Sequence, residues 1–466
     1  MRDFNVIISP IEFISFNTIT IDKELGKHSK AVVSGSIADD KVEQYLTMLM
    51  GELWVSIVAI CESDEQETLM TGVVTDFSID HEAHYKELTL TIHSGSYLMD
   101  VARHFRTFQN ADIAYNDVMG ILEQEYEDAS HIGAELGCVA IEDFLMQYEE
   151  TDWQFIRRLA SKLNYNISPA DRFDGQRYYF GPRESEQISF PENTKYTVHK
   201  AIGEYLKKDS ASETSFSEND CLEYIVSSRD IYRVWDAAIM LGMPVFVYKV
   251  ESRYEHGEFI HHYHMRTEKG LEVLRTFNGK VSGCSFDATV KAIKEDLVQI
   301  EFSNDENTMQ EITKWFKYST VYSTPDGTGW YCMPEVGDTV RLHIPNKNEN
   351  DGYVISSVHL DVEGSDRKNP DHKSIMNKQR KEILFTPDKL TLTNNNGIRI
   401  EIVDGEGVNI VSNRSVNISA RDNVTISSER ASMIVAGTDA VHIEQSGASI
   451  YMDDDISFTG GEFRIQ

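Results

Sequence analysis

Two histidine-rich segments have residue types that could bind a metal ion. The segment His81–His84 (HEAH) is one residue shorter than the HExxH zinc signature, in which two histidines on one helix face hold the metal. His261, His262 and His264 form a denser cluster, in which His262 and His264 share one side of a strand and could bind a metal or titrate near neutral pH. The flanking residues favour a solvated hairpin turn for the first segment and polar residues on the wet face of a hairpin for the second.

Acidic side chains give no stronger sign of chemistry. Asp453–Asp455 lacks the glycine and the distal glutamate of a calcium loop, and a solvated turn is the better interpretation. The pair Glu149–Glu150 is unremarkable in a chain with 76 acidic residues. Asn278–Lys280 lacks the rest of a phosphate-binding loop, and no dinucleotide fingerprint or GxSxG elbow occurs. We therefore predict a protein that is not an enzyme and has no catalytic residues, no cofactor and no bound metal.

Composition limits the partners and the compartment. The formal net charge of −32 over 466 residues repels phosphate backbones, so we predict no nucleic-acid partner. The five cysteines are far apart and form no CxxC pair, which argues against disulfides and fits a reducing compartment. No signal-peptide pattern and no run of about twenty apolar residues occurs. We expect synthesis in the cytoplasm without a signal peptide.

Hydrophobic periodicity divides the first 278 residues into strands and helices. Alternation predicts strands at Val55–Ile60 and Leu88–His93. Apolar residues at helical spacing follow Asn116 and predict a first helix there. A second helix is expected after Thr151, because Thr151 and Gln154 have the spacing of a capping box. A further strand is predicted at Arg177–Phe180, and a polar linker at Lys207–Asp220. The two arms of a hairpin are predicted at Val245–Val250 and Phe259–Met265.

A compact unit of short strands begins at Gly279. About five strands within eighty residues, with glycines at the bends, are typical of a small closed barrel such as an OB-fold. The strands are predicted at Lys280–Ile293, Leu297–Phe302, Trp330–Pro334, Asp338–Ile344 and Tyr353–Leu360.

The C-terminal tract has a short repeat. Pairs of β-forming residues recur every eight residues, three times in succession, and continue after a shift in phase, with polar residues and glycine between them. Such a period indicates a solenoid or fibre. The residues predicted to form the core of this fibre are Ile398, Ile400, Ile402, Val408, Ile410, Val416, Ile418, Val424, Ile426, Val441, Ile443 and Ile450.

One eight-residue repeat, or octad, buries too little apolar surface to stay ordered alone. Ordering each residue costs about 1–2 kcal/mol of backbone entropy, and burying one Ile or Val recovers about 1.5–3 kcal/mol. Two buried residues in every eight are therefore insufficient unless other strands add packing. Three identical chains wound round one axis would stack these layers and leave few free edges. A single-chain parallel β-helix is the alternative, although its coils usually need about twenty residues.

The order of these parts resembles the VgrG and phage late-control (gpD-like) hub–spike family. Tyr148–Leu163 (YEETDWQFIRRLASKL) is similar to the hub signature of that family, Met333–Asp338 (MPEVGD) to an element of its OB-fold, and Glu382–Asn395 to the entry of the spike shaft. The residues that match the hub motif are Thr151, Asp152, Trp153 and Phe155.

This resemblance implies a mainly β fold with an embedded α+β segment, hub β-barrel domains, an OB-fold collar and a C-terminal triple-stranded intertwined β-helix. The implied function is the structural hub and central membrane-puncturing spike of a contractile, phage-tail-like injection particle. The domains are expected at 1–110 (hub β-barrel), 111–206 (α+β hub segment), 207–278 (second hub β-barrel portion), 279–362 (OB-fold collar), 363–385 (linker) and 386–466 (trimeric spike).

The partners implied are two further copies of the chain, inner-tube or tube-initiator proteins, baseplate proteins and, transiently, the envelope of a target cell. The protein would adapt a trimeric needle to a hexameric tube and reside in the baseplate of the particle. Near the C-terminus only His442 occurs, so a His-x-His iron tip is absent and a separate tip protein remains an option.

Two other functions stay open at this stage. A cell-wall hydrolase carried on a tail scaffold would need a catalytic insertion, but only Asp361–Arg380 separates the barrel from the shaft. A receptor-binding tail fibre would not need the hub motif. The sequence also leaves a phage tail, an R-type bacteriocin-like particle and a type VI-like apparatus as alternatives.

Overall fold

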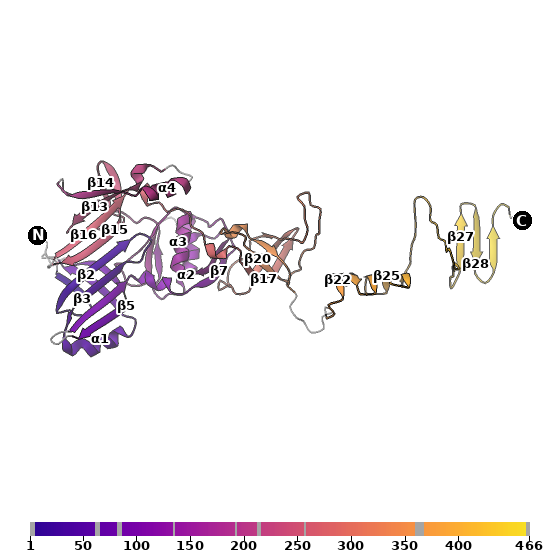
Figure 1. Ribbon diagram of the computed structural model, residues 1–466, viewed down its shortest axis with the longest axis horizontal. Coiled ribbons are helices and arrows are strands. Elements are labelled where there is room, and N and C mark those ends of the chain that lie inside the picture. Colours follow the sequence, from indigo (N-terminus) through magenta and orange to yellow (C-terminus); the bar gives the residue numbers. More distant parts are fainter. Residues whose placement is uncertain are drawn as a thin grey trace. The chain divides into compact units, whose positions relative to one another are not determined.

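The protein is described by a computed structural model that covers residues 5–60, 66–81, 86–133, 136–191, 193–211, 216–255, 258–358 and 368–462. Two compact units are present, Met1–Leu360 and Asp361–Gln466, and each is described by itself. Strands predominate in both units, and helices occur only within the first among the described residues. The predicted mainly β fold with an embedded α+β segment is confirmed (Figure 1).

An eleven-stranded sheet forms the large part of the first unit. Its order is β1-β4-β5-β6-β3-β2-β15-β16-β13-β12, and β14 pairs with β15. In β4, alternate residues such as Val55 and Ile57 are buried, so the strand predicted there is confirmed, as is the strand predicted at Leu88–His93. The strands are β1 (Asn5–Ser9), β2 (Ser15–Glu24), β3 (Lys30–Ile37), β4 (Trp54–Ile60), β5 (Gln66–His81), β6 (Lys86–His93), β12 (Tyr196–Lys200), β13 (Leu222–Ser228), β14 (Ala237–Met240), β15 (Met243–Glu255) and β16 (Glu258–Arg266).

This sheet joins residues that are far apart in the sequence. Strand β2 pairs antiparallel with β15, and Ile21 lies opposite Ser252. The hairpin predicted from Val245 onward is confirmed, because β15 and β16 pair antiparallel with a bulge between Val247 and Lys249. Strands from the first hundred residues and from residues 222–266 therefore share one hydrogen-bonded layer.

The α+β segment lies between the large sheet and the next group of strands in the first unit (Figure 1). Helix α2 buries Val118, Met119 and Leu122, which confirms the helix predicted after Asn116. None of the described helices is long and apolar enough to cross a membrane. The elements are β7 (His104–Phe108), α2 (Tyr115–Glu123), β8 (Ser130–Ile132), β9 (Leu145–Glu150), α3 (Asp152–Lys162), β10 (Ile167–Pro169) and β11 (Arg177–Phe180), and α1 (Val42–Leu49) belongs to the preceding part.

Five short strands form the next sheet, in the order β19-β18-β17-β20-β21. The strand predicted at Trp330–Pro334 is wrong, because Trp330 and Tyr331 are exposed in a loop in which the Trp330 N–H donates to the Tyr322 carbonyl. Their aromatic character resembles that of a strand, but they do not alternate between buried and exposed positions. The strands are β17 (Ser285–Lys294), β18 (Leu297–Phe302), β19 (Phe316–Lys317), β20 (Thr339–His343) and β21 (Tyr353–Ile355).

The linker predicted at Lys207–Asp220 is wrong in its first part. Helix α4 (Ile202–Ala211) extends into it, and the Lys208 ammonium, which is buried, donates to the Gly270 carbonyl at 2.6 Å. The ion pair between Glu204 and Arg266 also ties this polar helix to strand β16. Tertiary contacts thus stabilise a helix that has no clear hydrophobic period.

The second unit contains two antiparallel sheets. The first is a five-stranded meander, β22-β23-β24-β25-β26, and the second is β27-β28-β29. Residues 413–440, between them, are described but contain no strand. The strands are β22 (Lys373–Met376), β23 (Glu382–Phe385), β24 (Lys389–Thr393), β25 (Ile398–Val403), β26 (Gly407–Ser412), β27 (Val441–Gln445), β28 (Ala448–Met452) and β29 (Ile456–Thr459).

Candidate functional site

The histidines of β16 point to different sides of the large sheet. His261 is 2% exposed, stacks on Phe259 with ring centroids 5.6 Å apart, and lies 2.7 Å from the Ser252 hydroxyl through Nδ1. The wet-face interpretation is therefore wrong for His261, because strand alternation turns it into the core. Burial, with smaller contributions from the nearby Lys23 and His262, lowers the pKa of His261 to about 4.

The other two histidines of this cluster have separate partners. His264 Nδ1 lies 2.8 Å from Glu223 Oε1, and His262 Nδ1 lies 2.8 Å from the Ser227 hydroxyl. These neighbours hold the rings apart, and within the described part of the chain no group of three metal-ligating side chains contains them. In the His81–His84 segment, residues 82–85 lie outside the described residues.

The acidic segment near the C-terminus is a tight turn. Asp453–Asp455 connects β28 to β29, the Asp455 N–H donates to Asp453 Oδ1 at 3.2 Å, and the Asp453 N–H donates to the Asp455 carbonyl at 3.1 Å. The solvated turn predicted from the sequence is confirmed.

The hub motif begins at the N-terminus of helix α3. Thr151 is the N-cap: its hydroxyl oxygen accepts a hydrogen bond from the Gln154 N–H at 3.2 Å and donates to the Asp100 carboxylate. The next residue, Asp152, is fully buried. Its Oδ1 accepts from Arg106 Nη1 at 2.6 Å, and its Oδ2 accepts from the Tyr126 hydroxyl at 2.8 Å. The motif therefore caps the helix and anchors a buried carboxylate.

The two aromatic residues of the motif are core residues. Trp153 is buried, with its ring 4.6 Å from the His28 ring between centroids, so α3 contacts the connection between β2 and β3 through it. Phe155 stacks on Phe108 of strand β7 at 5.9 Å and 15°. Within the first unit, the four motif residues hold α3 in place and leave little surface for a ligand.

A charge network surrounds Asp152. Arg106 of β7 forms ion pairs with Asp152 and Glu125. Its Nε also lies 3.6 Å from Glu306 Oε2. Burial alone would lower the pKa of Arg106, but the Asp152 and Glu125 carboxylates hold it above its usual value. Burial, together with the Asp152 carboxylate, raises the pKa of Tyr126 well above its usual value.

One group in this network has metal-ligand atoms close together. The ligand atoms of His104, Glu125 and Glu306 lie within 4.8 Å of one another. However, the Arg106 guanidinium already occupies this space, with Nη2 2.9 Å from His104 Nδ1. Because a fixed cation repels a metal ion, the group fits an ion-pair network and not a metal centre.

Further contacts fix the connections of the sheet β19-β18-β17-β20-β21 to the α+β segment. The Thr107 N–H donates to Asp305 Oδ1 at 3.1 Å, and the Gln109 N–H donates to Gln310 Oε1 at 2.9 Å. Arg158 of α3 bonds Glu349 at 2.8 Å. These partners are about two hundred residues apart in the sequence. No motif or spacing in the sequence indicated Arg106, Arg158, Glu306 or Glu349.

The predicted spike residues of the meander share one sheet face. Ile400 lies opposite Ile410 and Ile402 lies opposite Val408, while Leu392 continues the row on β24. The five predicted residues from Ile398 to Ile410 are 40–63% exposed. The structure therefore aligns them on one face of the meander, which this chain alone does not cover.

The next octads have no sheet partner in the described chain. Val416, Ile418, Val424 and Ile426 are 53–70% exposed within the strandless stretch 413–440. Further on, the small sheet again aligns apolar residues in one row, with Ile443 opposite Ile450 and Ile450 opposite Phe458. Val441 lies in the same strand as Ile443, on the same side.

Comparison with known proteins relates this architecture to phage tails. Residues 40–163 match the family model of the phage tail baseplate hub (GPD). This match includes the hub motif and ends at the C-terminus of helix α3. No match was found among curated protein sequences.

Several solved structures share the fold. The Escherichia coli c3393 protein, a component of the type VI secretion system with structural similarity to the T4 bacteriophage tail proteins gp27 and gp5, has a TM-score of 0.51 at 12% identity and covers 76% of this chain and 100% of its own. A Francisella PdpA–VgrG complex, in its half-lidded form, has a TM-score of 0.58 at 10% identity and covers 88% of both chains. The lidless form has a TM-score of 0.56 at 10% identity and covers 88% of this chain and 98% of its own.

The fold is shared with VgrG and with a type VI secretion component, and residues 40–163 match the phage tail baseplate hub. This match supports a structural role as a hub and spike in a tail-like injection system.

Proposed function

We propose that the protein works as a homotrimer, in which three copies form the hub and three copies of Asp361–Gln466 form one membrane-puncturing needle. The observation that carries this proposal is the uncovered apolar face of the second unit. The hub would seat the hexameric inner tube or its initiator proteins, contact baseplate proteins, and reside in the baseplate of a released or virion-bound particle.

The meander supports a partner of the same sequence. Its apolar row crosses strands β24, β25 and β26, whereas the opposite face carries the charged residues Arg399 and Glu401, which pair with each other. A contiguous apolar face of this kind is rare on a monomeric soluble protein. Two further copies would cover it and remove the sheet edges.

The octads support the same arrangement by their spacing. Val416 and Ile418 repeat as Val424 and Ile426 after eight residues, and no strand of this chain pairs with them in the described structure. Their backbone groups need hydrogen-bond partners to form a rigid shaft. Strands supplied by two more copies would provide them, and Ile398 to Ile450 would then form the spike core.

The remaining parts of the chain would serve as the hub and collar. We propose barrel portions at 1–110 and 207–278, the α+β segment at 111–206, an OB-fold collar at 279–362 and a linker at 363–385 that leads to the spike at 386–466. The ion pair of Arg158 with Glu349 supports a rigid connection between α3 and the collar strands. The protein would transmit force and would not catalyse a reaction.

Sedimentation of the purified full-length chain tests the proposal. We expect a species of three times the chain mass, and we expect it to dissociate when Val416, Ile418, Val424 and Ile426 are all changed to Ser. The matched control is Asn417→Ser, which changes a polar position between two of the same residues. A folded, stable monomer with an ordered C-terminal unit would contradict the trimeric needle.

Two experiments separate this role from its alternatives. A cell-wall degradation assay would detect a hydrolase, and we expect no activity above that of buffer. Electron microscopy of the intact particle, with an antibody against the chain, would place the protein on the central axis for a hub and at the periphery for a receptor-binding fibre. The genes adjacent to the coding sequence would distinguish a phage tail, a bacteriocin-like particle and a type VI-like apparatus.

A further inference from the structure

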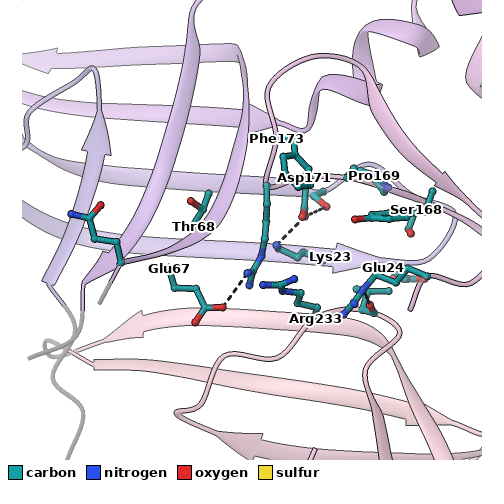
Figure 2. A pocket seen from close by; sticks show the side chains of 16 residues that line it. Lys23, Glu24, Glu67, Thr68, Ser168, Pro169, Asp171, Phe173 and Arg233 are labelled. Carbon is teal, nitrogen blue, oxygen red and sulfur yellow. Dashed lines mark hydrogen bonds and ion pairs between the residues drawn. The ribbon is translucent and has the colours of Figure 1, made fainter. Parts of the chain in front are cut away.

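A charged pocket lies in the first unit, away from the hub motif. It has a volume of about 610 Å³ and is formed by the end of β2, the start of β5, the loop after β10 and the loop before β14. This size is within the range of sites that bind small molecules or a short peptide segment. Figure 2 shows Lys23, Asp171 and Arg233 facing the same space from three of these elements.

Basic residues outnumber acidic residues around this pocket. Its described lining has four basic side chains and three acidic ones, whereas the whole chain has 44 basic and 76 acidic residues. The basic side chains are Lys23, Arg172, Arg183 and Arg233. The pocket thus gathers positive charge on a protein that is otherwise strongly negative.

Two of these cations, Lys23 and Arg183, are already bound to carboxylate and carbonyl groups of the protein itself. The Lys23 ammonium donates to the Leu69 carbonyl at 2.5 Å and pairs with Asp171 at 2.9 Å. The Arg183 guanidinium pairs with Asp236 and donates to the Val234 carbonyl at 2.8 Å. Both side chains are therefore fixed and define the floor of the pocket.

The other two cations retain binding capacity. The Arg172 guanidinium uses Nη1 for an ion pair with Glu67 at 3.0 Å. Arg233 is 44% exposed at the side chain, and its guanidinium lies 3.9 Å from Glu186, beyond hydrogen-bond distance, while the Asp236 carboxylate binds its backbone N–H at 2.7 Å. A guanidinium has five N–H donors in a planar fork that fits a carboxylate or phosphate.

The cations also repel one another. Burial lowers the pKa of Lys23, the Asp171 carboxylate partly offsets this effect, and Arg172 and Arg233 lower the pKa further. This dependence indicates that the three positive groups are close enough to interact through the pocket. An anion placed between them would relieve this repulsion.

We propose that this pocket binds an anionic group, a carboxylate or a phosphate, which the guanidinium groups of Arg233 and Arg172 hold above the Lys23 ammonium. In a particle, such a group would be offered by a small-molecule ligand or by an acidic side chain or chain end of a neighbouring protein. The site is independent of the trimeric needle, since every residue in it belongs to the first unit.

Isothermal titration calorimetry of the full-length protein tests the site with two probes, citrate and inorganic phosphate, at constant ionic strength. We expect at least one probe to bind with a millimolar Kd or tighter, and Arg233→Gln to weaken it about tenfold or more, which corresponds to losing one charge-assisted contact. Binding of citrate alone would identify a carboxylate site, and binding of phosphate alone a phosphate site.

The matched control is Arg229→Gln. Arg229 is an exposed arginine in the same loop as Arg233, pairs with Glu258 and does not line the pocket. We expect the Arg229→Gln variant to bind both probes as the unchanged protein does. No heat from either probe up to about 10 mM, or equal weakening in both variants, would overturn the proposal. Circular dichroism checks that both variants remain folded.

Discussion

Arg158 of helix α3 reaches Glu349 in the short helical turn Glu349–Asp351 before β21, with 2.8 Å between Nη1 and Oε1 and both side chains almost fully buried. The same guanidinium pairs with Glu150 at 2.9 Å and donates to the Met146 carbonyl at 2.8 Å. Burial raises the pKa of Glu150, an effect that Arg158 partly offsets. One arginine therefore compensates two buried carboxylates from distant parts of the chain.

Removal of one partner should destabilise the first unit. We expect Arg158→Met to lower the free energy of unfolding by about 3–5 kcal/mol, because it leaves Glu150 and Glu349 buried without a cation. Chemical denaturation followed by tryptophan fluorescence measures the change. Arg157→Gln is the control, since Arg157 is exposed on the same helix, and it should change stability by less than about 0.5 kcal/mol. Equal effects of both variants would contradict the ion-pair explanation.

Acid should destabilise the first unit through His261. Its pKa of about 4 in the folded protein lies below the usual value of 6.5, so the unfolded chain binds an additional proton between these pH values. Stability is then complete above pH 6.5 and falls as the pH drops towards 4, by at most about 3 kcal/mol. Denaturant titrations at several pH values measure this slope.

The slope should become shallower in His261→Gln. The control is His199→Gln on the exposed strand β12, which removes a histidine without disturbing the core and should keep the slope of the unchanged protein. A slope that is the same in His261→Gln and in the unchanged protein would show that other groups cause the acid effect.

Gly95 should tolerate no side chain. A Cβ atom there would lie 2.1 Å from the Gly175 carbonyl oxygen and 2.5 Å from the Trp54 ring. We expect Gly95→Ala to lower the melting temperature through an overpacking cost of about 1–3 kcal/mol. The contrasting variant is Gly120→Ala in helix α2, where nothing lies within 4 Å and alanine should stabilise the helix by about 0.5–1 kcal/mol. Opposite signs in differential scanning calorimetry are expected, and a loss of stability in both would contradict the steric argument.

The rate of trypsin cleavage in the stretch 413–440 should show whether the proposed needle is assembled. Arg414, Arg421 and Arg430 lie in the stretch 413–440, which has no strand partner in the single chain. Three intertwined copies would bury this backbone, so we expect the assembled protein to resist cleavage there. The variant with Ser at Val416, Ile418, Val424 and Ile426 should be cut at these arginines at least about tenfold faster, because its backbone is then accessible. Mass spectrometry of the fragments identifies the sites, and rapid cleavage of the unchanged assembly would contradict the prediction.

Local patterns were enough to predict some elements. Strand β4 follows from alternation, because every second residue from Val55 faces the core, and helix α3 follows from Thr151 at its N-cap. Helix α4 was missed because its stability comes from contacts such as that of Lys208 with Gly270. The Arg106 network was also missed, since its carboxylates come from Glu125, Asp152 and Glu306, and their proximity depends on the tertiary fold.

The spike residues show a different limit. Their eight-residue spacing is visible in the sequence, but Ile418 and Ile426 are exposed in the single chain, and in the proposed trimer their neighbours would come from other copies. A repeat therefore predicts which residues face inward and cannot show how many chains surround the axis.

The backbone N–H groups of Thr107 and Gln109 donate to the side chains of Asp305 and Gln310, and these bonds have a mechanical consequence. A force applied to the sheet β19-β18-β17-β20-β21 would pass into β7 through these bonds, which bypass the roughly two hundred residues of intervening backbone. Because the bonds are short and act in parallel, the load would be shared among them.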